Sequence, residues 1–333
     1  MSFVRKNELE LSCLTSSPSK GFPIMNRTIR NSALVASSLL AIPALAACGA
    51  GEAATGDTLT FAAIPAESSQ SLQSDFANIV ELLEQEAGVS IEFQNASDYA
   101  AVIEGQRAGQ IDMASYGPFS YVIAKDSGVD IEAVAAPTND KDTAPAYTSL
   151  AYVREDSDIN SLEDIDGQEV CFVDAASTSG YLVPMKGLMD ADKSMDDDMT
   201  QVLAGGHDAS LLSLDSGNCE VAFAHDAMLE TLVESGQLED GAVRSIWESD
   251  PIPEDPIAIS NSIDPEVADK ITTALREKAN KPALVEAGIC ESEDDCVLPE
   301  LIEYGYLPVT DEDFNSIREL CEETQAEACN SVG

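Results

Sequence analysis

Residues 169–189 read EVCFVDAASTSGYLVPMKGLM and decide the fold, because they join an apolar strand to a helix through a turn of small polar residues. The run Glu169 to Val173 predicts a strand, and the apolar spacing that follows predicts a helix from Gly180 to Met189. The turn between them carries three adjacent hydroxyl residues, Ser177, Thr178 and Ser179. A strand that leads directly into a helix is the repeating unit of an α/β sheet.

The same alternation continues on both sides of this unit. Downstream, the sequence predicts strands at 201–203 and 221–224 and helices at 208–214 and 226–235. Upstream, a separate series predicts strands at 58–64, 89–93, 111–116 and 131–136, with helices around 76–87, 99–108 and 118–125. Strands that alternate with helices imply mainly parallel sheets covered by helices on both faces.

Two extended runs, SLAYVR at 149–154 and PIAIS at 256–260, separate the two series and are predicted to cross as a pair between two lobes. The predicted lobe 1 contains residues 58–148 and 261–333, and the predicted lobe 2 contains residues 149–260. Thr310 and Asp313 resemble a capping box, which starts a closing helix expected to pack on lobe 1. Two α/β lobes joined by two strands leave a cleft between them.

The composition limits the function classes. The chain has 333 residues, 44% of them hydrophobic, which is enough for a full core. Its 61 acidic and 17 basic residues give a formal net charge of −44, which excludes nucleic acid as the default partner. With two histidines and no Cys-x-x-Cys pair, neither a metal site nor a cofactor is expected.

The amino-terminal region predicts export. From Met25, two arginines precede an apolar stretch at 33–44 and then Leu-Ala-Ala-Cys, ending at Cys48. Residues 25–47 have the three parts of a signal peptide, and the apolar stretch is too short to remain as a membrane span. The last four residues resemble the lipobox of bacterial lipoproteins, so Cys48 is expected to carry lipid and residues 48–57 to form a tether.

Residues 1–24 lack pattern and precede the charged start of the signal sequence, so they are predicted to be an upstream extension that is not translated. An intact peptide from residues 1–24 in the expressed protein would overturn this prediction.

Six further cysteines follow Cys48, and an exported protein can join them as disulfides. Cys171 and Cys219 each open an apolar run, as adjacent strands of one sheet can. The other four lie near the carboxyl terminus and are expected to pair among themselves, namely Cys290, Cys296, Cys321 and Cys329. Six cysteines allow 15 pairings.

Several polar residues stand where a predicted strand meets a predicted helix, and the carboxyl ends of parallel strands are where α/β sheets bind ligands. The hydroxyl turn can cradle an anion with free backbone N–H groups, or it can simply cap its helix. His207 can likewise donate to an oxyanion or cap, and Asp226 suits a helix start through the helix dipole alone. Tyr99 and Tyr116 stand at similar junctions in lobe 1, where a tyrosine can also belong to the edge of the core.

Beyond these local signals, the segments 97–124, 174–184, 205–229 and 249–260, together with the lipobox, resemble the solute-binding proteins of phosphate, phosphite and phosphonate ABC transporters. The resemblance covers essentially the whole mature chain. It implies a type II periplasmic-binding fold, with two lobes and a two-strand hinge, that closes on its ligand. It also implies a binding protein rather than an enzyme, which delivers its ligand to a membrane permease powered by an ATPase.

Carried over residue by residue, the resemblance assigns Ser177, Thr178 and Ser179 to the phosphonate-binding turn and His207 to the binding histidine. It assigns Tyr99 and Tyr116 to the tyrosines that close over the ligand. Members that take up aminoalkylphosphonates resemble one another in holding the ammonium group with two carboxylates, for which the candidates here are Asp226 and Asp255. The position of Asp226 is occupied by a glutamate in such a relative.

A carboxylate that faces the oxyanion instead can accept a hydrogen bond only from a protonated oxygen, so it would favour a monoprotonated ligand over sulfate. The same lobed fold also serves binders of sulfonate, nitrate, amino acids or a thiamin precursor, some of which use an arginine clamp. A hydrolase with His207 or His225 as base would need a nucleophile motif such as G-x-S-x-G or a zinc motif such as H-E-x-x-H, and neither occurs. A structural lipoprotein is the remaining alternative.

Overall fold

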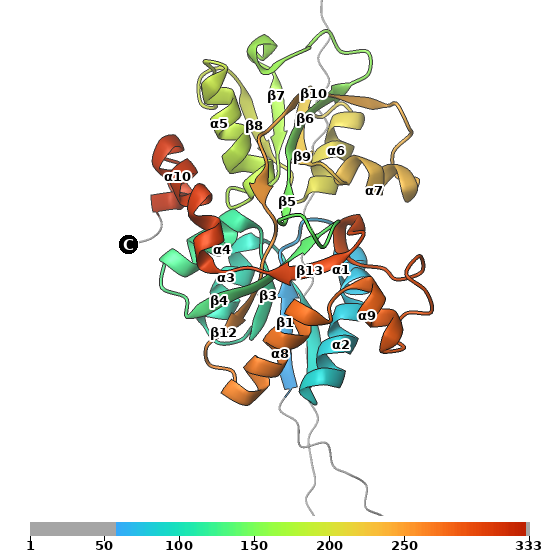
Figure 1. Ribbon diagram of the computed structural model, residues 1–333. Helices are drawn as coiled ribbons and strands as arrows, with labels where there is room; N and C mark the ends of the chain where they lie inside the picture. The colour runs from blue at the N-terminus through green and yellow to red at the C-terminus, as the bar shows by residue number, and fades with distance from the viewer. Residues whose placement is uncertain (1–57, 331–333) are drawn as a thin grey trace, which may run out of the picture. The chain divides into compact units, whose positions relative to one another are not determined.

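The structure is a computed structural model that describes residues 58–330. The upstream extension, the signal peptide, the lipidation site Cys48 and the whole tether therefore lie outside the described residues. Within the described range, no helix combines the length and the apolar character that a membrane crossing requires. These residues form two sheets with helices packed on both faces of each, joined by a pair of short strands (Figure 1).

Lobe 1 is used below for the six-stranded sheet and its helices. The strand order is β13-β4-β12-β3-β1-β2. The strands are β1 (Thr58–Ala63), β2 (Ser90–Asn95), β3 (Met113–Ser115), β4 (Ile131–Thr138), β12 (Ile257–Ser260) and β13 (Gly305–Pro308). The helices are α1 (Ser69–Asp75), α2 (Ala77–Ala87), α3 (Tyr99–Arg107), α4 (Pro118–Asp126), α8 (Pro265–Glu277), α9 (Lys281–Glu286) and α10 (Asn315–Thr324).

Lobe 2 is the five-stranded sheet and its helices, with strand order β10-β6-β9-β7-β8. The strands are β6 (Ser149–Arg154), β7 (Glu169–Phe172), β8 (Thr200–Leu203), β9 (Val221–His225) and β10 (Val243–Glu248). The helices are α5 (Val183–Asp190), α6 (His207–Asp215) and α7 (Met228–Glu234). A π-helical turn, Thr178–Leu182, connects the end of β7 to α5.

The lobes are connected through β5 (Ala146–Tyr147) and β11 (Ile252–Pro253), which pair antiparallel. The paired segment therefore lies just before each of the two extended runs in which the crossing was predicted. One boundary also differs, because β12 was assigned to lobe 2 from the sequence but pairs with β3 and β4 in the sheet of lobe 1. The strand β12 lies in the apolar run predicted at 256–260, but the chain has already returned to lobe 1 when this run begins.

The strand pairing is mixed rather than mainly parallel. Four of the nine strand pairs in the two large sheets are parallel, and five are antiparallel. The antiparallel pairs arise where the chain enters or returns to a sheet, at β6, β10, β12 and β13. Alternating strands and helices predict the parallel β-α units correctly, but they do not show the direction of a returning strand.

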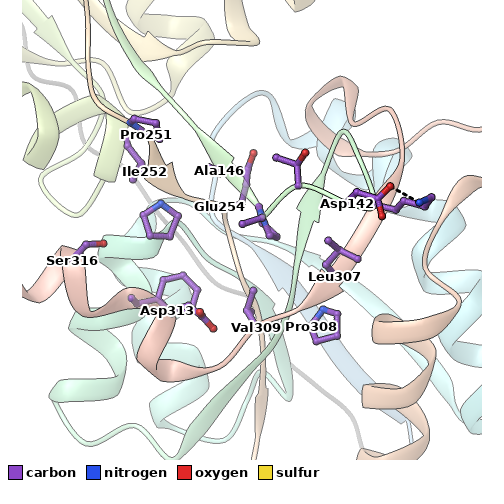
Figure 2. A pocket seen from close by; sticks show the side chains of 16 residues that line it. Asp142, Ala146, Pro251, Ile252, Glu254, Leu307, Pro308, Val309, Asp313 and Ser316 are labelled. Atoms are coloured by element: carbon purple, nitrogen blue, oxygen red, sulfur yellow. Dashed lines mark hydrogen bonds and ion pairs between the residues drawn. The ribbon is translucent and has the colours of Figure 1, made fainter.

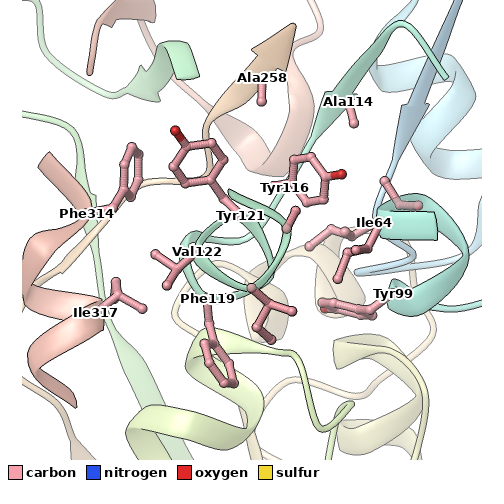
Figure 3. Packing of buried hydrophobic residues seen from close by; sticks show 14 of the residues in the cluster. Ile64, Tyr99, Ala114, Tyr116, Phe119, Tyr121, Val122, Ala258, Phe314 and Ile317 are labelled. Atoms are coloured by element: carbon pink, nitrogen blue, oxygen red, sulfur yellow. The ribbon is translucent and has the colours of Figure 1, made fainter. Parts of the chain in front are cut away.

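The apolar core of lobe 1 continues into lobe 2 on the side of α4 and α10. Figure 3 shows Tyr99, Tyr116, Phe119 and Tyr121 packed in one buried cluster, which also includes Leu182 and Val183 of lobe 2. Thr310 and Asp313 form the predicted capping box, with Asp313 Oδ2 accepting hydrogen bonds from the backbone N and Oγ1 of Thr310 at 2.7 and 3.0 Å. The closing helix α10 contacts α4 of lobe 1 and also α5 of lobe 2.

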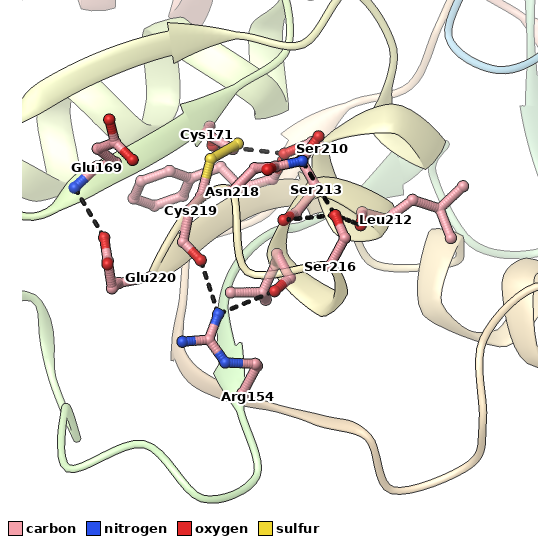
Figure 4. Close-up of a disulfide and its surroundings, with 12 residues drawn as sticks. Arg154, Glu169, Cys171, Ser210, Leu212, Ser213, Ser216, Asn218, Cys219 and Glu220 are labelled. Carbon is pink, nitrogen blue, oxygen red and sulfur yellow. Dashed lines mark hydrogen bonds between the residues drawn. A yellow bond between two sulfur atoms is a disulfide. The ribbon is translucent and has the colours of Figure 1, made fainter.

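The structure places six cysteines in three pairs at the separation that a disulfide requires. The Cα–Cα distance is 5.8 Å for Cys171 and Cys219, 5.3 Å for Cys290 and Cys296, and 5.7 Å for Cys321 and Cys329. Figure 4 shows the first pair, with the Arg154 guanidinium donating to the carbonyl oxygen of Cys219 at 2.8 Å. This pair ties β7 to the segment that leads into β9.

Candidate functional site

The hydroxyl turn after β7 is built tightly against its own strand. Ser177 has an extended backbone, and its Oγ accepts a hydrogen bond from the backbone N–H of Gly180 at 3.1 Å. A Cβ atom added to Gly180 would lie 2.3 Å from Val173 Cγ2, so only glycine allows the turn to approach the strand this closely. Ser177, Thr178 and Ser179 are all buried, with 1–2% of each residue exposed. Three buried hydroxyls therefore stand at one end of the sheet of lobe 2.

These hydroxyls line a small cavity between the two lobes. The cavity has a volume of about 10 Å³, measured as the space open to the centre of a water molecule, which is room for about one water. Its lining residues come from lobe 1, lobe 2 and the crossing segments: Ile64, Ala66, Tyr99, Gly117, Tyr147, Ser177, Thr178, Ser179, His207, His225, Asp255 and Glu300. None of these twelve residues is a lysine or an arginine.

Two hydrogen bonds join the lobes across this cavity. The backbone N–H of His207 donates to the carbonyl oxygen of Ala66 at 2.7 Å, and the backbone N–H of Phe119 donates to Thr178 Oγ1 at 2.9 Å. The second bond places the Thr178 hydroxyl at the amino end of α4, where N–H groups lack helical partners. The two bonds therefore tie lobe 1 to lobe 2 beside the cavity.

The His207 side chain is held in one tautomer. Its Nδ1 accepts a hydrogen bond from the backbone N–H of His225 at 3.1 Å. Burial, followed by the proximity of His225, lowers the pKa of His207 well below its usual value, so the ring is neutral near neutral pH. A neutral imidazole that accepts at Nδ1 carries its proton on Nε2, which leaves that atom as a donor.

Two polar atoms at the cavity are buried and have no hydrogen-bond partner among the described residues. They are the Tyr99 hydroxyl and His225 Nε2, on residues that are 1% and 4% exposed. Burial raises the pKa of Tyr99 well above its ordinary value, and the nearby Ser177 hydroxyl offsets only part of that rise, so Tyr99 remains a neutral donor. Unpaired buried polar atoms are costly, and two at one cavity indicate a place where a polar ligand binds.

Two carboxyl groups face the same space. Burial, followed by the charges of Glu300 and Glu254, raises the pKa of Asp255 well above its usual value, while a hydrogen bond with Tyr147 lowers it in part. Glu300 lies in the short helical turn Pro299–Leu301 and has a left-handed backbone, with φ of 55°. Glu254 is also buried, and burial followed by the charge of Glu300 raises its pKa well above the usual value. The cavity thus combines several donors with an acidic wall.

Six of the eight residues predicted to bind ligand line the cavity, and two do not. The Tyr116 hydroxyl donates to Gln106 Oε1 at 2.8 Å inside the core of lobe 1, so Tyr116 is a core residue. Asp226 is exposed, and its Oδ2 accepts hydrogen bonds from the backbone N and Oγ1 of Thr148 at 3.1 and 3.3 Å. Tyr147, His225 and Glu300 line the cavity without having been assigned to it from the sequence.

A larger groove lies beside the crossing strands and contains none of the predicted binding residues. The groove has a volume of about 650 Å³. Figure 2 shows its lining residues, which include Ile252, Leu307, Pro308 and Val309. Its side chains are mostly apolar or proline, and its charged pair, Lys141 with Asp142, is exposed. The converging donors therefore place the candidate site in the small cavity rather than in this groove.

Comparison with known proteins identifies the family. The model of the family described as "ABC transporter, phosphonate, periplasmic substrate-binding protein" matches residues 61–314. The phosphate-import protein PhnD of Mycolicibacterium smegmatis is 39% identical over 282 residues, which are 82% of this chain and 88% of that protein. The phosphonates-binding periplasmic protein of Escherichia coli is 31% identical over 217 residues, 64% of each chain.

Solved structures have the same fold. The binding protein component of an ABC phosphonate transporter from Pseudomonas aeruginosa matches with a TM-score of 0.72 and 25% identity, over 84% of this chain and 89% of that one. PhnD1 from Prochlorococcus marinus, solved in complex with methylphosphonate, matches with a TM-score of 0.70 over 81% of this chain and 98% of that one. At 16% identity, the second match shows the fold alone. The chain therefore has the type II periplasmic-binding fold and belongs to the periplasmic substrate-binding proteins of phosphonate ABC transporters.

Proposed function

We propose that this protein captures a phosphonate- or phosphate-type oxyanion in the cavity between its lobes and delivers it to the permease of an ABC importer. The observation that carries the proposal is the unpartnered Tyr99 hydroxyl opposite the buried turn Ser177–Ser179. A tetrahedral oxyanion offers the acceptors that these donors lack. The protein acts in this account by binding and release, so it is not an enzyme.

The anion is held by dipoles. With a net charge of −44, the long-range field opposes the entry of an anion, and salt screens that field beyond about 8–10 Å. Attraction must therefore come from short hydrogen bonds to the charged ligand. We assign these bonds to the hydroxyls of Tyr99, Ser177, Thr178 and Ser179 and to Nε2 of His207.

The acidic side of the cavity, formed by Asp255 and Glu300, then meets the part of the ligand that carries a hydrogen. That part is either an ammonium group on an aminoalkyl arm or the P–OH group of a protonated oxyanion. The relatives support a PO₃-type head in general, since one is named for phosphate import and another for binding phosphonates. Phosphate, phosphite, methylphosphonate and 2-aminoethylphosphonate share this head and differ in one substituent.

We also propose that the protein works on the outer face of the cytoplasmic membrane as a lipoprotein anchored through Cys48, with its three cysteine pairs joined as disulfides. The signal sequence, the lipobox and the even number of paired cysteines support this placement. Its partners are then the permease and ATPase subunits of the importer. Replacement of Cys48 by serine should release the protein from the membrane fraction of its host, and retention in that fraction would argue against the anchor.

Isothermal titration calorimetry of the purified protein tests the proposed ligand class. The panel is phosphate, phosphite, methylphosphonate and 2-aminoethylphosphonate, with sulfate as the control. We expect at least one phosphorus ligand to bind more tightly than sulfate. Heat changes indistinguishable from dilution for all four phosphorus compounds would overturn the proposal.

A further inference from the structure

Glu300 reaches the cavity from a part of lobe 1 that is distant in sequence from the other lining residues. The turn Pro299–Leu301 that carries it contacts α1 in lobe 1 and α7 in lobe 2. Two successive residues, Glu300 and Leu301, have left-handed backbones, with φ of 55° and 58°. The chain thus adopts an unusual backbone at the point where Glu300 lines the cavity next to Asp255.

The two carboxyl groups form an acidic pair without a cation in the cavity lining. Glu300 raises the pKa of Asp255, and like charges this close are not both ionised without cost. Its charge also raises the pKa values of Glu67, Asp75, Tyr99, Glu254 and Tyr306. Burial and the charge of Glu300 thus favour the protonated form of Asp255, which can then donate a hydrogen bond, whereas a Glu300 carboxylate offers only acceptor oxygens.

The polar atoms without hydrogen-bond partners at the cavity also restrict which ligand can bind. The Tyr99 hydroxyl is a buried donor without a partner, and His225 Nε2 is a second buried polar atom without one among the described residues. His207 adds a donor at Nε2 on the same side. A ligand that suits the cavity therefore offers acceptor oxygens to the Tyr99 hydroxyl and to His207 Nε2, and a hydrogen to a carboxylate.

We propose that Glu300 is a specificity-determining residue that accepts a hydrogen bond from a P–OH group, so that the site selects tetrahedral oxyanions which keep one proton when bound. This inference rests on the proposed function and names the chemical class of its ligand. A monoprotonated phosphate or phosphonate supplies both the acceptors and the single donor.

The same arrangement of groups disfavours the binding of sulfate. It has the tetrahedral shape and the acceptor oxygens, but near neutral pH it carries no hydrogen. A protonated Asp255 can donate to it, but a Glu300 carboxylate would meet an oxygen lone pair. A buried charge without a partner opposes binding, so the second carboxyl is what separates the two anions.

The variant Glu300→Gln tests this assignment, because an amide can donate to sulfate as well as accept from P–OH. Glu303→Gln is the matched control, since it removes the same charge from an exposed position three residues away. Titration calorimetry with phosphate, sulfate and 2-aminoethylphosphonate should show the wild-type protein preferring phosphate over sulfate. Glu300→Gln should bind sulfate about tenfold more tightly than the wild type does, and Glu303→Gln should behave as the wild type.

The possible results distinguish a failure of the proposed function from a failure of the role assigned to Glu300. If the wild type binds no phosphorus oxyanion, the proposed function fails. If it binds phosphate but Glu300→Gln excludes sulfate as strongly as the wild type and Glu303→Gln do, this inference alone fails. A wild type that prefers 2-aminoethylphosphonate, and a Glu300→Gln variant that loses only that ligand, would overturn the inference by assigning the carboxyl pair to an ammonium group.

Discussion

The backbone N–H of His225, at the end of β9, donates a 3.1 Å hydrogen bond to Nδ1 of His207, the first residue of α6. The two rings also meet edge to face, with their centroids 4.7 Å apart. A main-chain group thus fixes the orientation and the tautomer of the His207 side chain. The sheet of lobe 2 thereby presents a neutral N–H donor to the cavity.

Replacement of His207 by alanine should weaken ligand binding and leave closure possible. The contact between the lobes at this position uses the backbone N–H of His207, which the substitution keeps. The loss of one hydrogen bond to a charged ligand should cost about 1.5–3 kcal/mol. Calorimetric titration with the tightest phosphorus ligand measures it, and an unchanged affinity would show that His207 only caps its helix.

The Thr178 hydroxyl should contribute to ligand affinity both as an acceptor, through its oxygen, and as a donor, through its hydrogen. Its Oγ1 accepts from Phe119 N–H across the cleft, which leaves its hydrogen for the ligand. Thr178→Val keeps the shape and removes both interactions, so affinity should fall by roughly 1.5–3 kcal/mol. Thr178→Ser keeps the hydroxyl and serves as the control. Equal losses in the two variants would point to packing of the methyl group instead.

Gly180→Ala should destabilise the protein. The added methyl would lie 2.3 Å from Val173 Cγ2 and 2.8 Å from Ser177 Oγ, and strain of this kind costs roughly 1–3 kcal/mol. Urea denaturation measures the change. Because Val173 Cβ would also lie 2.4 Å from the methyl, the second substitution is Val173→Gly, and in that background Gly180→Ala should recover part of the stability that it costs in the wild type. No recovery would mean that the turn, rather than its contact with the strand, requires the glycine.

Stability should fall as pH rises through the titration of Glu67. Burial first, and then the charges of Asp75, Glu300 and Asp208, raises its pKa from 4.5 to about 8. The folded protein holds this proton more tightly than the unfolded chain, so the stability present below pH 4.5 is lost progressively up to pH 8. Glu67→Gln should therefore raise the melting temperature above pH 8 and change it little at pH 4.5.

Exposed Glu92 supplies the control for that measurement, since Glu92→Gln removes the same charge from the surface of β2. A similar gain from both variants above pH 8 would attribute the effect to net charge rather than to the position of Glu67. Asp208 lies on lobe 2 and Glu67 on lobe 1, so the same titration should also weaken ligand binding at high pH.

The Cys171–Cys219 pair should matter more for stability than the Cys290–Cys296 pair. The sequence separations are 48 and 6 residues, for which loop entropy predicts about 4 and about 2 kcal/mol. Double alanine variants of each pair, unfolded in urea, measure the two contributions. When the wild type is unfolded without reductant, these four cysteines should give no reactive free thiol. Detection of four reactive thiols would contradict the proposed disulfides.

The rule that ligands bind where strands end and helices begin predicted most of the polar residues that line the cavity, while their role in binding stays a prediction. Ser177, His207 and Tyr99 each stand at such a junction, and all three line the cavity. The same rule failed for Tyr116 and Asp226, because it locates the end of a strand without showing where a side chain points. The buried strand β9 ends at His225, whose ring faces the cavity, while Asp226 turns outward to Thr148.

The residues missed in the sequence depend on long-range structure. Tyr147 lies on β5, one residue before the run in which the crossing was predicted. Glu300 belongs to no strand-to-helix junction and follows the cysteine-rich segment, whose path depends on packing against both lobes. Neither periodicity nor spacing indicates a contact of this kind, so only the three-dimensional arrangement brings Glu300 next to Asp255.

The Tyr99→Phe variant tests the central claim most directly, because it removes one buried hydroxyl that has no partner among the described residues. If the cavity binds a PO₃-type oxyanion, the ligand-free variant should be as stable as the wild type or more stable. Its affinity for the tightest of phosphate, phosphite and methylphosphonate should fall by roughly 1.5–3 kcal/mol. Calorimetric titration beside thermal denaturation gives both values, and an affinity equal to that of the wild type would contradict the account.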